Sequence, residues 1–233
     1  MTPLQKALEI IEECERTRSK KLDLSGLGLT ELPIEVCELE WLEGLNLSGK
    51  RVSAGYFTNL INELPSKVGQ LINLVTLDVS SCLFTDLSFL TYLPKLQTLS
   101  CSSNQLTSLF GLVHVPRLWN LNCGSNQLDS LSELVNVPRL QSLNCGFNQL
   151  TSLSNLGCAP QLQSLDCIYN QLTSLTDLVY VPQLQSLDCG GNQLTSLSDL
   201  AHVPQLQSLG CGGNQLTGLS DLAYVDTPLS TTE

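Results

Sequence analysis

Apolar residues in the second half of the chain recur with a period of 22 residues. Each copy follows the pattern LxxLxCxxNxLxxLxxLxxxPx, and the residues at one position of successive copies form a column. The first leucines of six successive copies are Leu96, Leu118, Leu140, Leu162, Leu184 and Leu206. A fixed period of this length predicts a solenoid, in which each copy forms one coil that stacks on the next.

Within each coil, the pattern predicts one short strand and no full helix. In the stretch LNCGSN, Leu121 and Cys123 alternate with polar or small residues, and this alternation is typical of a strand with one buried face. Strands of successive coils would run in parallel, about 4.8 Å apart. The remaining leucines would fill the interior from the far side, where 22 residues leave room only for 3₁₀ turns or irregular chain.

The asparagine and cysteine columns both have structural interpretations. The asparagine column is expected to hydrogen-bond backbone groups of its own coil and of the next coil. Its members are Asn104, Asn126, Asn148, Asn170, Asn192 and Asn214. The cysteine column is interpreted as a row of small buried apolar side chains, because its side chains all face the core and no CxxC pair occurs. We therefore expect no disulfide, no metal site and no cofactor.

The iterated signature LxxLxLxxN/CxL resembles the leucine-rich repeat family over roughly residues 19–226. The resemblance implies an α/β solenoid of horseshoe shape, with a parallel β-sheet on the concave side and a convex side of 3₁₀ or irregular structure. We count about nine repeats. The first two are longer and carry an LPxxV ending, and the second contains an insertion near residues 49–58.

The two ends of the solenoid differ. Residues 1–18 are predicted to form a capping helix, with Thr2 and Gln5 in a capping box and Pro3 in the first turn. Its expected apolar face consists of Leu4, Ala7, Leu8, Ile11 and Cys14. Residues 227–233 are expected to be a tail without a cap, so the last coil is a candidate for contact with a partner or with a second copy of the chain.

The start of the chain also resembles a particular bacterial class. The capping segment followed by LDLSGLGLTELP is similar to leucine-rich-repeat regions of bacterial multidomain proteins, including those that precede Roc-COR GTPase modules. Leucine-rich-repeat effector ligases usually show LPxLP in each coil, a motif that this chain lacks.

Charge and composition exclude several functions. The formal net charge of −11 argues against nucleic acid or an anionic membrane as the main partner. The N-terminus lacks the continuous apolar core of a signal peptide, no stretch is long enough to span a membrane, and ten cysteines suit a reduced, cytoplasmic protein. No Ser-His-Asp or Cys-His grouping stands out, so we do not expect an enzyme.

Candidate binding residues are those that depart from the repeat. The insertion places Lys50, Arg51, Tyr56 and Phe57 at a rim of the concave face, either as interface anchors or as part of a decorative loop. On the concave face, the large side chains are Phe147, Ile168 and Tyr169, beside the acidic Asp166 and Asp188. The large side chains could bind a partner or simply cover the turn.

Two functions follow from this pattern. The first is a scaffold that binds a protein partner through its concave face and the insertion. The alternative is the N-terminal regulatory arm of a larger enzyme, either a Roc-COR GTPase or an effector ligase, whose catalytic domain would follow residue 233.

Overall fold

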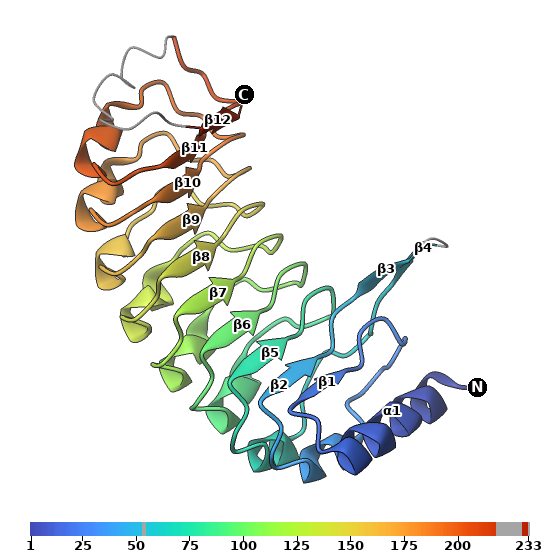
Figure 1. The fold of residues 1–233 in the computed structure, drawn as a ribbon. Coiled ribbons are helices and arrows are strands. Elements are labelled where there is room, and N and C mark those ends of the chain that lie inside the picture. The colour runs from blue at the N-terminus through green and yellow to red at the C-terminus, as the bar shows by residue number, and fades with distance from the viewer. Residues whose placement is uncertain (53–54, 218–229, 233) are drawn as a thin grey trace.

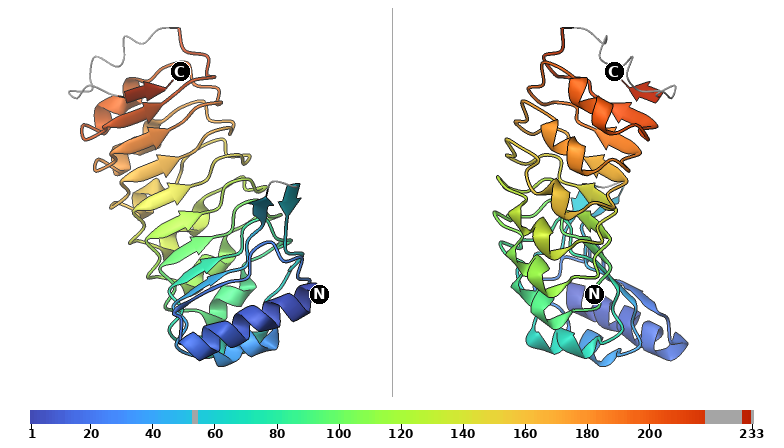
Figure 2. Two further views of the ribbon diagram at one scale, coloured as in Figure 1. Left: turned by 45° about the vertical axis from the view of Figure 1, so that its right-hand side comes forward. Right: turned by 90° about the vertical axis from the view of Figure 1, so that its left-hand side faces the viewer.

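The protein is an open, curved stack of coils with one continuous parallel sheet (Figure 1). The computed structural model describes residues 1–52, 55–217 and 230–232, without the side chains of 50–56 and 230–232. Each coil contributes one strand of three residues to the inner side of the arc and a short 3₁₀ helix to the outer side. Because coils stack only on their neighbours, the molecule is elongated, as the two turned views in Figure 2 show.

Ten strands form the main sheet among the described residues, in the order β1-β2-β5-β6-β7-β8-β9-β10-β11-β12. The first nine follow one another in the nine predicted repeats, and every neighbouring pair is parallel and in register. The strands are β1 (Lys21–Asp23), β2 (Gly44–Asn46), β5 (Thr76–Asp78), β6 (Thr98–Ser100), β7 (Asn120–Asn122), β8 (Ser142–Asn144), β9 (Ser164–Asp166), β10 (Ser186–Asp188), β11 (Ser208–Gly210) and β12 (Ser230–Thr232).

The outer side of the arc consists of short 3₁₀ helices, as the 22-residue period predicts. Seven of the eight described here begin after a leucine or proline, and η6 begins after Asn155. They are η1 (Ile34–Glu38), η2 (Ser66–Gln70), η3 (Ser88–Tyr92), η4 (Phe110–His114), η5 (Ser132–Asn136), η6 (Leu156–Cys158), η7 (Thr176–Tyr180) and η8 (Ser198–His202). The expected leucine-rich-repeat solenoid, with a concave sheet and a 3₁₀ convex side, is confirmed.

A single apolar core runs along the whole stack. In the coil that begins at Leu118, every leucine of the pattern is fully buried, and so is Cys123. Leucine supplies most of this core, in line with the aromatic content of only 5%. A coil that loses its neighbour would expose its leucines, so coil stacking provides the main stabilisation.

The helix α1 (Pro3–Thr17) covers the first coil (Figure 1). The capping box is present: Thr2 Oγ1 accepts from the Gln5 amide, and the Gln5 side chain accepts from the Thr2 amide. Ala7, Ile11 and Cys14 are buried, as predicted. Leu8 is half-buried against the core, and Leu4, on the first turn, stays 48% exposed.

The C-terminal end of α1 is tied to the first coil by Trp41. The guanidinium of Arg18 lies 4.0 Å from the centre of the Trp41 ring, and the indole nitrogen donates to the carbonyl of Ser19. Arg18 has a left-handed backbone that ends the helix. A cation–π contact and a hydrogen bond therefore fix the angle at which the chain leaves the helix.

The insertion in the second coil forms a β-hairpin. Strand β3 (Lys50–Val52) pairs antiparallel with β4 (Gly55–Phe57), and Lys50 lies opposite Phe57. Figures 1 and 2 show the hairpin projecting from the edge of the main sheet at which the strands end. After it, Asn59 returns to the core, fully buried, where its amide bonds the backbone of Leu24, Leu29 and Leu47.

The asparagine column links each coil to the one before it. The amide nitrogen of Asn148 donates to the carbonyls of Cys123, Cys145 and Gly146, at 3.0–3.2 Å. Its oxygen accepts from the Leu128 amide at 2.9 Å. Cys123 and Leu128 belong to the preceding coil, so the expectation of contacts with the next coil is wrong. The reason is the path of the chain. The turn after each strand places the asparagine side chain in the interior, within hydrogen-bond distance of the backbone of the preceding coil.

Candidate functional site

A column of left-handed residues follows the ends of the strands on the concave side. Its members are Ser81, Ser103, Ser125, Phe147, Tyr169, Gly191 and Gly213, and all have a positive φ. The amides of the first six members donate to a carbonyl of the next coil; for Phe147 and Tyr169 these bonds are 2.8 Å long. Stacking therefore imposes this backbone conformation even where the residue is not glycine.

Phe147 and Tyr169 are the unusual members of this column. Their φ angles are 55° and 48°, a region that costs a bulky L-residue about 1–2 kcal/mol relative to the right-handed conformation. Their rings stack with a centroid separation of 4.6 Å and an interplanar angle of 24°. The spacing of parallel strands, about 4.8 Å, is close to the stacking distance of aromatic rings, so neighbours in one column stack directly.

This stacked pair stays partly open to solvent. Phe147 is 48% exposed and Tyr169 58% exposed. One face of Tyr169 covers Gly191, where an added Cβ would lie 2.6 Å from the ring. Tyr169 therefore covers the turn of the next coil, as one of the two alternatives predicts. Both rings remain partly exposed, and their role in binding stays a prediction.

A hollow lies beside the stacked pair, toward the C-terminal coils. Its volume is about 390 Å³. It is lined by Ile168, Tyr169, Asp188, Gly190, Gly191, Gly210, Gly212 and Gly213. The glycines form the floor of the hollow, because they have no side chains to cover the backbone.

Asp166 and Asp188 continue a polar column along the strands. Asp166 accepts from the side chain of Asn144 at 2.8 Å and from the amide of Ile168 at 3.2 Å. Burial, together with the charge of Asp188, raises the pKa of Asp166, while the Ile168 amide lowers it. Asp188 is exposed, and its carboxylate lies against Gly210, where an added Cβ would collide with it. Asp188 therefore brings negative charge to the hollow.

The other predicted site residues do not belong to the aromatic stack, although Ile168 lines the hollow beside it. Ile168 is half-buried and leans over Gly146 of the preceding coil, so it does not extend the aromatic stack. Phe57, in β4, is 50% exposed. The side chains of Lys50, Arg51 and Tyr56 lie outside the described part of the structure, and their binding role stays a prediction.

Most of the cysteine thiols are buried. All ten are free thiols, and eight are buried. Burial raises the pKa of Cys123 and of Cys189 to about 12, so their thiolates are strongly disfavoured at neutral pH. No group of three or more potential metal ligands occurs within residues 1–52, 55–217 and 230–232.

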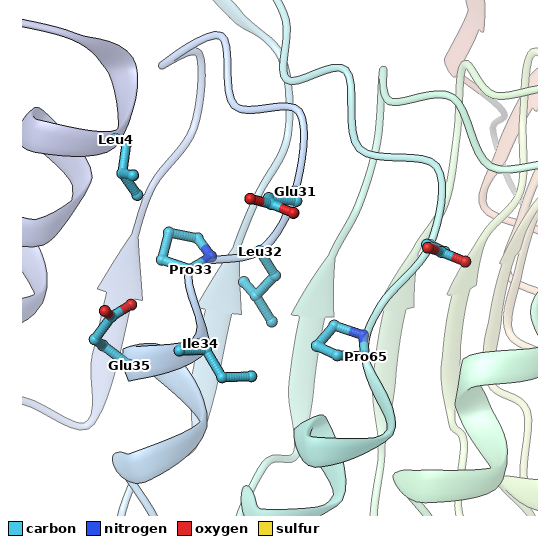
Figure 3. Close-up of a pocket in the computed structure, with 8 residues that line it drawn as sticks. Leu4, Glu31, Leu32, Pro33, Ile34, Glu35 and Pro65 are labelled. Carbon is cyan, nitrogen blue, oxygen red and sulfur yellow. The ribbon is translucent and has the colours of Figure 1, made fainter.

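A second hollow lies at the N-terminal end, between α1 and the LPxxV segments of the first two coils (Figure 3). Its volume is about 360 Å³, and it combines apolar side chains with three glutamates. Leu4 and Ile34 are its exposed apolar members. Its glutamates are Glu31, Glu35 and Glu63.

One cluster was missed in the sequence. Lys95, Arg117, Arg139 and Trp119 lie at the edge where the strands begin, opposite the edge that carries Phe147 and Tyr169. The signal was available, since the three cations fall in one column of the repeat.

Comparisons with known proteins agree with this architecture. A family model described as leucine-rich repeats (2 copies) matches residues 94–136, 138–180 and 182–224, together more than half of the chain. A search of curated protein sequences gave no match. The more specific resemblance to the repeats of Roc-COR proteins stays a prediction.

Solved structures share the fold. An internalin (InlF) of Listeria monocytogenes superposes with a TM-score of 0.79 at 24% identity, over 100% of this chain and 77% of that one. The functional domain of InlJ from the same organism, described as including a cysteine ladder, has a TM-score of 0.62 at 28% identity, over 92% of this chain and 50% of that one. The ectodomain of the Arabidopsis thaliana receptor kinase GASSHO1/SCHENGEN3, in complex with Casparian strip integrity factor 2, has a TM-score of 0.65 at 26% identity, over 86% of this chain and 25% of that one.

Within the described ranges, no helix has the length and apolar character needed to cross a membrane.

Proposed function

Because the chain belongs to the leucine-rich repeat family, we propose that it is a binding module that holds a protein partner on its concave face. The observation that carries this proposal is the stacked pair of Phe147 and Tyr169. Both side chains are about half exposed and both keep a left-handed backbone that serine or glycine occupies in the other coils. Two large apolar side chains in a costly conformation, on a face otherwise made of small polar residues, suit recognition better than folding.

The hollow beside the pair defines what the partner would offer. The rings form one wall, the glycines form the floor, and Asp188 supplies a negative charge. A partner side chain with an apolar stem and a basic end would fill this shape and pair with the carboxylate. The insertion hairpin, with Phe57 half exposed, would make a second contact at the same edge of the sheet.

The cytoplasm is the compartment that suits this module, because its ten cysteines are free thiols. Interaction modules of this family typically carry no catalysis of their own, and the proposal assigns none. The alternative function, a regulatory arm of a Roc-COR GTPase or an effector ligase, stays a prediction that the coding sequence after residue 233 would test.

The experiment is a partner capture followed by affinity measurements on matched variants. A partner isolated from a lysate of the source cells would be purified and titrated against the wild type, Tyr169→Ser and Phe147→Ser. Serine is the residue of three earlier coils at this position, so the backbone is preserved. Each change should weaken binding by about 2 kcal/mol, the effect of losing an interface anchor.

The controls are Ser186→Ala and Ser208→Ala, which remove small polar groups from the repeated part of the same face. They should leave the affinity within about twofold of the wild type, because single polar contacts at an interface rim contribute little. Equal losses in the serine and aromatic variants would show that recognition is spread along the repeated face, and the proposal would be wrong.

A further inference from the structure

We propose that Lys95, Arg117 and Arg139, with Trp119, form a second binding site that takes an acidic segment of a protein partner. The three cations are called the basic row below. The site goes beyond the proposed function, because it lies at the opposite edge of the sheet and shares no residue with the aromatic pair and its hollow.

The repeat itself aligns the basic row. Each cation stands three residues before the first residue of its strand, in β6, β7 and β8. These strands pair in parallel and in register, so the cations occupy equivalent places on successive coils, about 4.8 Å apart along the stack. From residue 68 to the end, the sequence contains no other lysine or arginine. All the positive charge of this part of the chain is therefore gathered in one row.

Arg117 and Arg139 line a hollow on the surface. Its volume is about 680 Å³, and none of the residues that line it is acidic. Its lining consists of Gln97, Arg117, Trp119, Arg139, Gln141 and Gln161. Trp119 is 41% exposed, and it stands where the neighbouring coils carry Gln97 and Gln141. A partly exposed tryptophan that lines the same hollow as two arginines combines an apolar surface with bidentate donors for carboxylates.

Among the described residues, the charges of the basic row have no ion-pair or hydrogen-bond partner. Elsewhere, Arg16 pairs with Glu13 at 2.6 Å and Lys20 pairs with Glu43 at 2.7 Å. By contrast, no hydrogen bond or ion pair engages a side chain of the basic row, or the indole nitrogen of Trp119, in the part of the chain that the structure describes. Three like charges in one row repel one another, and carboxylates of a bound segment would relieve this repulsion.

Size and net charge favour a short acidic protein segment over a nucleic acid. The basic row spans only two coil spacings, about 10 Å, which suits two or three carboxylates rather than a long run of phosphates. In an extended peptide, side chains at i and i+2 are about 7 Å apart on one face, within reach of neighbouring arginines. A longer polyanion would meet the rest of a protein whose net charge is −11.

The chain provides its own matched substitutions. The next three coils carry Gln161, Gln183 and Gln205 at the position of the basic row, so Arg117→Gln and Arg139→Gln should not disturb the fold. In the same way, Gln161→Arg would lengthen the row by one coil. Arg16→Gln, on α1, removes one positive charge far from the site, as each single substitution in the row does, and is the control.

The test uses the full chain and a fluorescent hexapeptide of alternating glutamate and serine, with glutamine replacing glutamate in the reference peptide. The wild type should bind the glutamate peptide better than the reference peptide, and more weakly as salt rises. The double variant Arg117→Gln/Arg139→Gln should lose about five- to tenfold in affinity, and Gln161→Arg should gain about two- to threefold. Arg16→Gln should match the wild type, and so should Tyr169→Ser, which separates this site from the concave aromatic site.

Several results would overturn the proposal. One is equal binding of the two peptides, and another is an equal loss of affinity in Arg16→Gln and the double variant. Tighter binding of a single-stranded oligonucleotide through the same row would assign the site to nucleic acid instead. Sedimentation that shows a dimer in the wild type and a monomer in the double variant would make a second copy of this chain the occupant.

Discussion

The asparagine column offers a sharp test of how neighbouring coils are held together. Replacing Asn148 by leucine keeps the approximate size of the side chain and removes four hydrogen bonds. The Cys123 carbonyl would keep a bond from Asn126, the preceding asparagine of the column, and the Cys145 carbonyl would keep one from Asn170, the following asparagine. The Gly146 carbonyl would keep a bond from the Ser125 amide. Only the amide of Leu128 would be left without a partner.

The cost can therefore be stated for one buried donor rather than for four lost bonds. An unsatisfied buried amide costs about 1–3 kcal/mol. With a urea dependence of about 2 kcal/mol per M, this corresponds to a fall of about 1 M in the unfolding midpoint, followed by circular dichroism. Hydrogen exchange adds a local readout: the Leu128 amide should exchange faster, while the Leu150 amide, which is bonded to Asn170, should stay protected.

The control is Gln149→Leu, which makes the same change of polarity at the next residue, where the side chain is exposed. An unchanged midpoint for Asn148→Leu would refute the reasoning. An equal shift in Gln149→Leu would refute it as well, because the effect would then come from the added apolar surface.

Three further outcomes are expected. Ile11→Asp places a charge in the buried face of α1 and should lower the free energy of unfolding by about 3 kcal/mol or cause aggregation. A variant as stable as the wild type in a thermal melt would show that the helix does not cap the stack. At pH 8, a thiol reagent should modify only Cys158 and Cys211 in the folded protein and all ten cysteines in urea, because the other eight side chains are buried from the reagent. Rapid labelling of more than two cysteines in the folded protein would contradict this. Gly111→Ala should destabilise by about 1–3 kcal/mol in urea, since its Cβ would collide with the Leu87 carbonyl; a neutral effect would mean that η3 and η4 can move apart.

The fold could be predicted because one local pattern is repeated many times. The strands, the buried leucines and the 3₁₀ convex side all follow from the spacing of apolar residues in 22-residue units. The capping box also follows from the sequence, since Thr2 and Gln5 need only each other and the helix start. In contrast, Asn59 was missed because the hairpin insertion shifts it out of the column, although the stretch Asn59-Leu60-Ile61 keeps the spacing of an NxL motif.

The candidate site was less predictable than the fold, because it depends on how side chains of neighbouring coils contact one another in three dimensions. Phe147 and Tyr169 could be identified as departures from the repeat, but their stacking and positive φ depend on the distance between coils. The direction of the asparagine bonds depends on the path of the turn, which the pattern does not contain. The basic row could be found in the sequence. Only the structure shows that, among the described residues, no acidic side chain pairs with it, and this is why we interpret it as a binding site.

Because the coils are so similar, a strand could pair with the wrong neighbour during folding. Strands β9, β10 and β11 present nearly the same residues to their neighbours, so a growing stack could pair one coil with the next but one and loop out the coil between them. The aromatic pair works against this error, because Phe147 finds a ring to stack on only when β8 and β9 are adjacent. We therefore expect the two side chains that we propose for binding to favour the correct order of coils during folding as well.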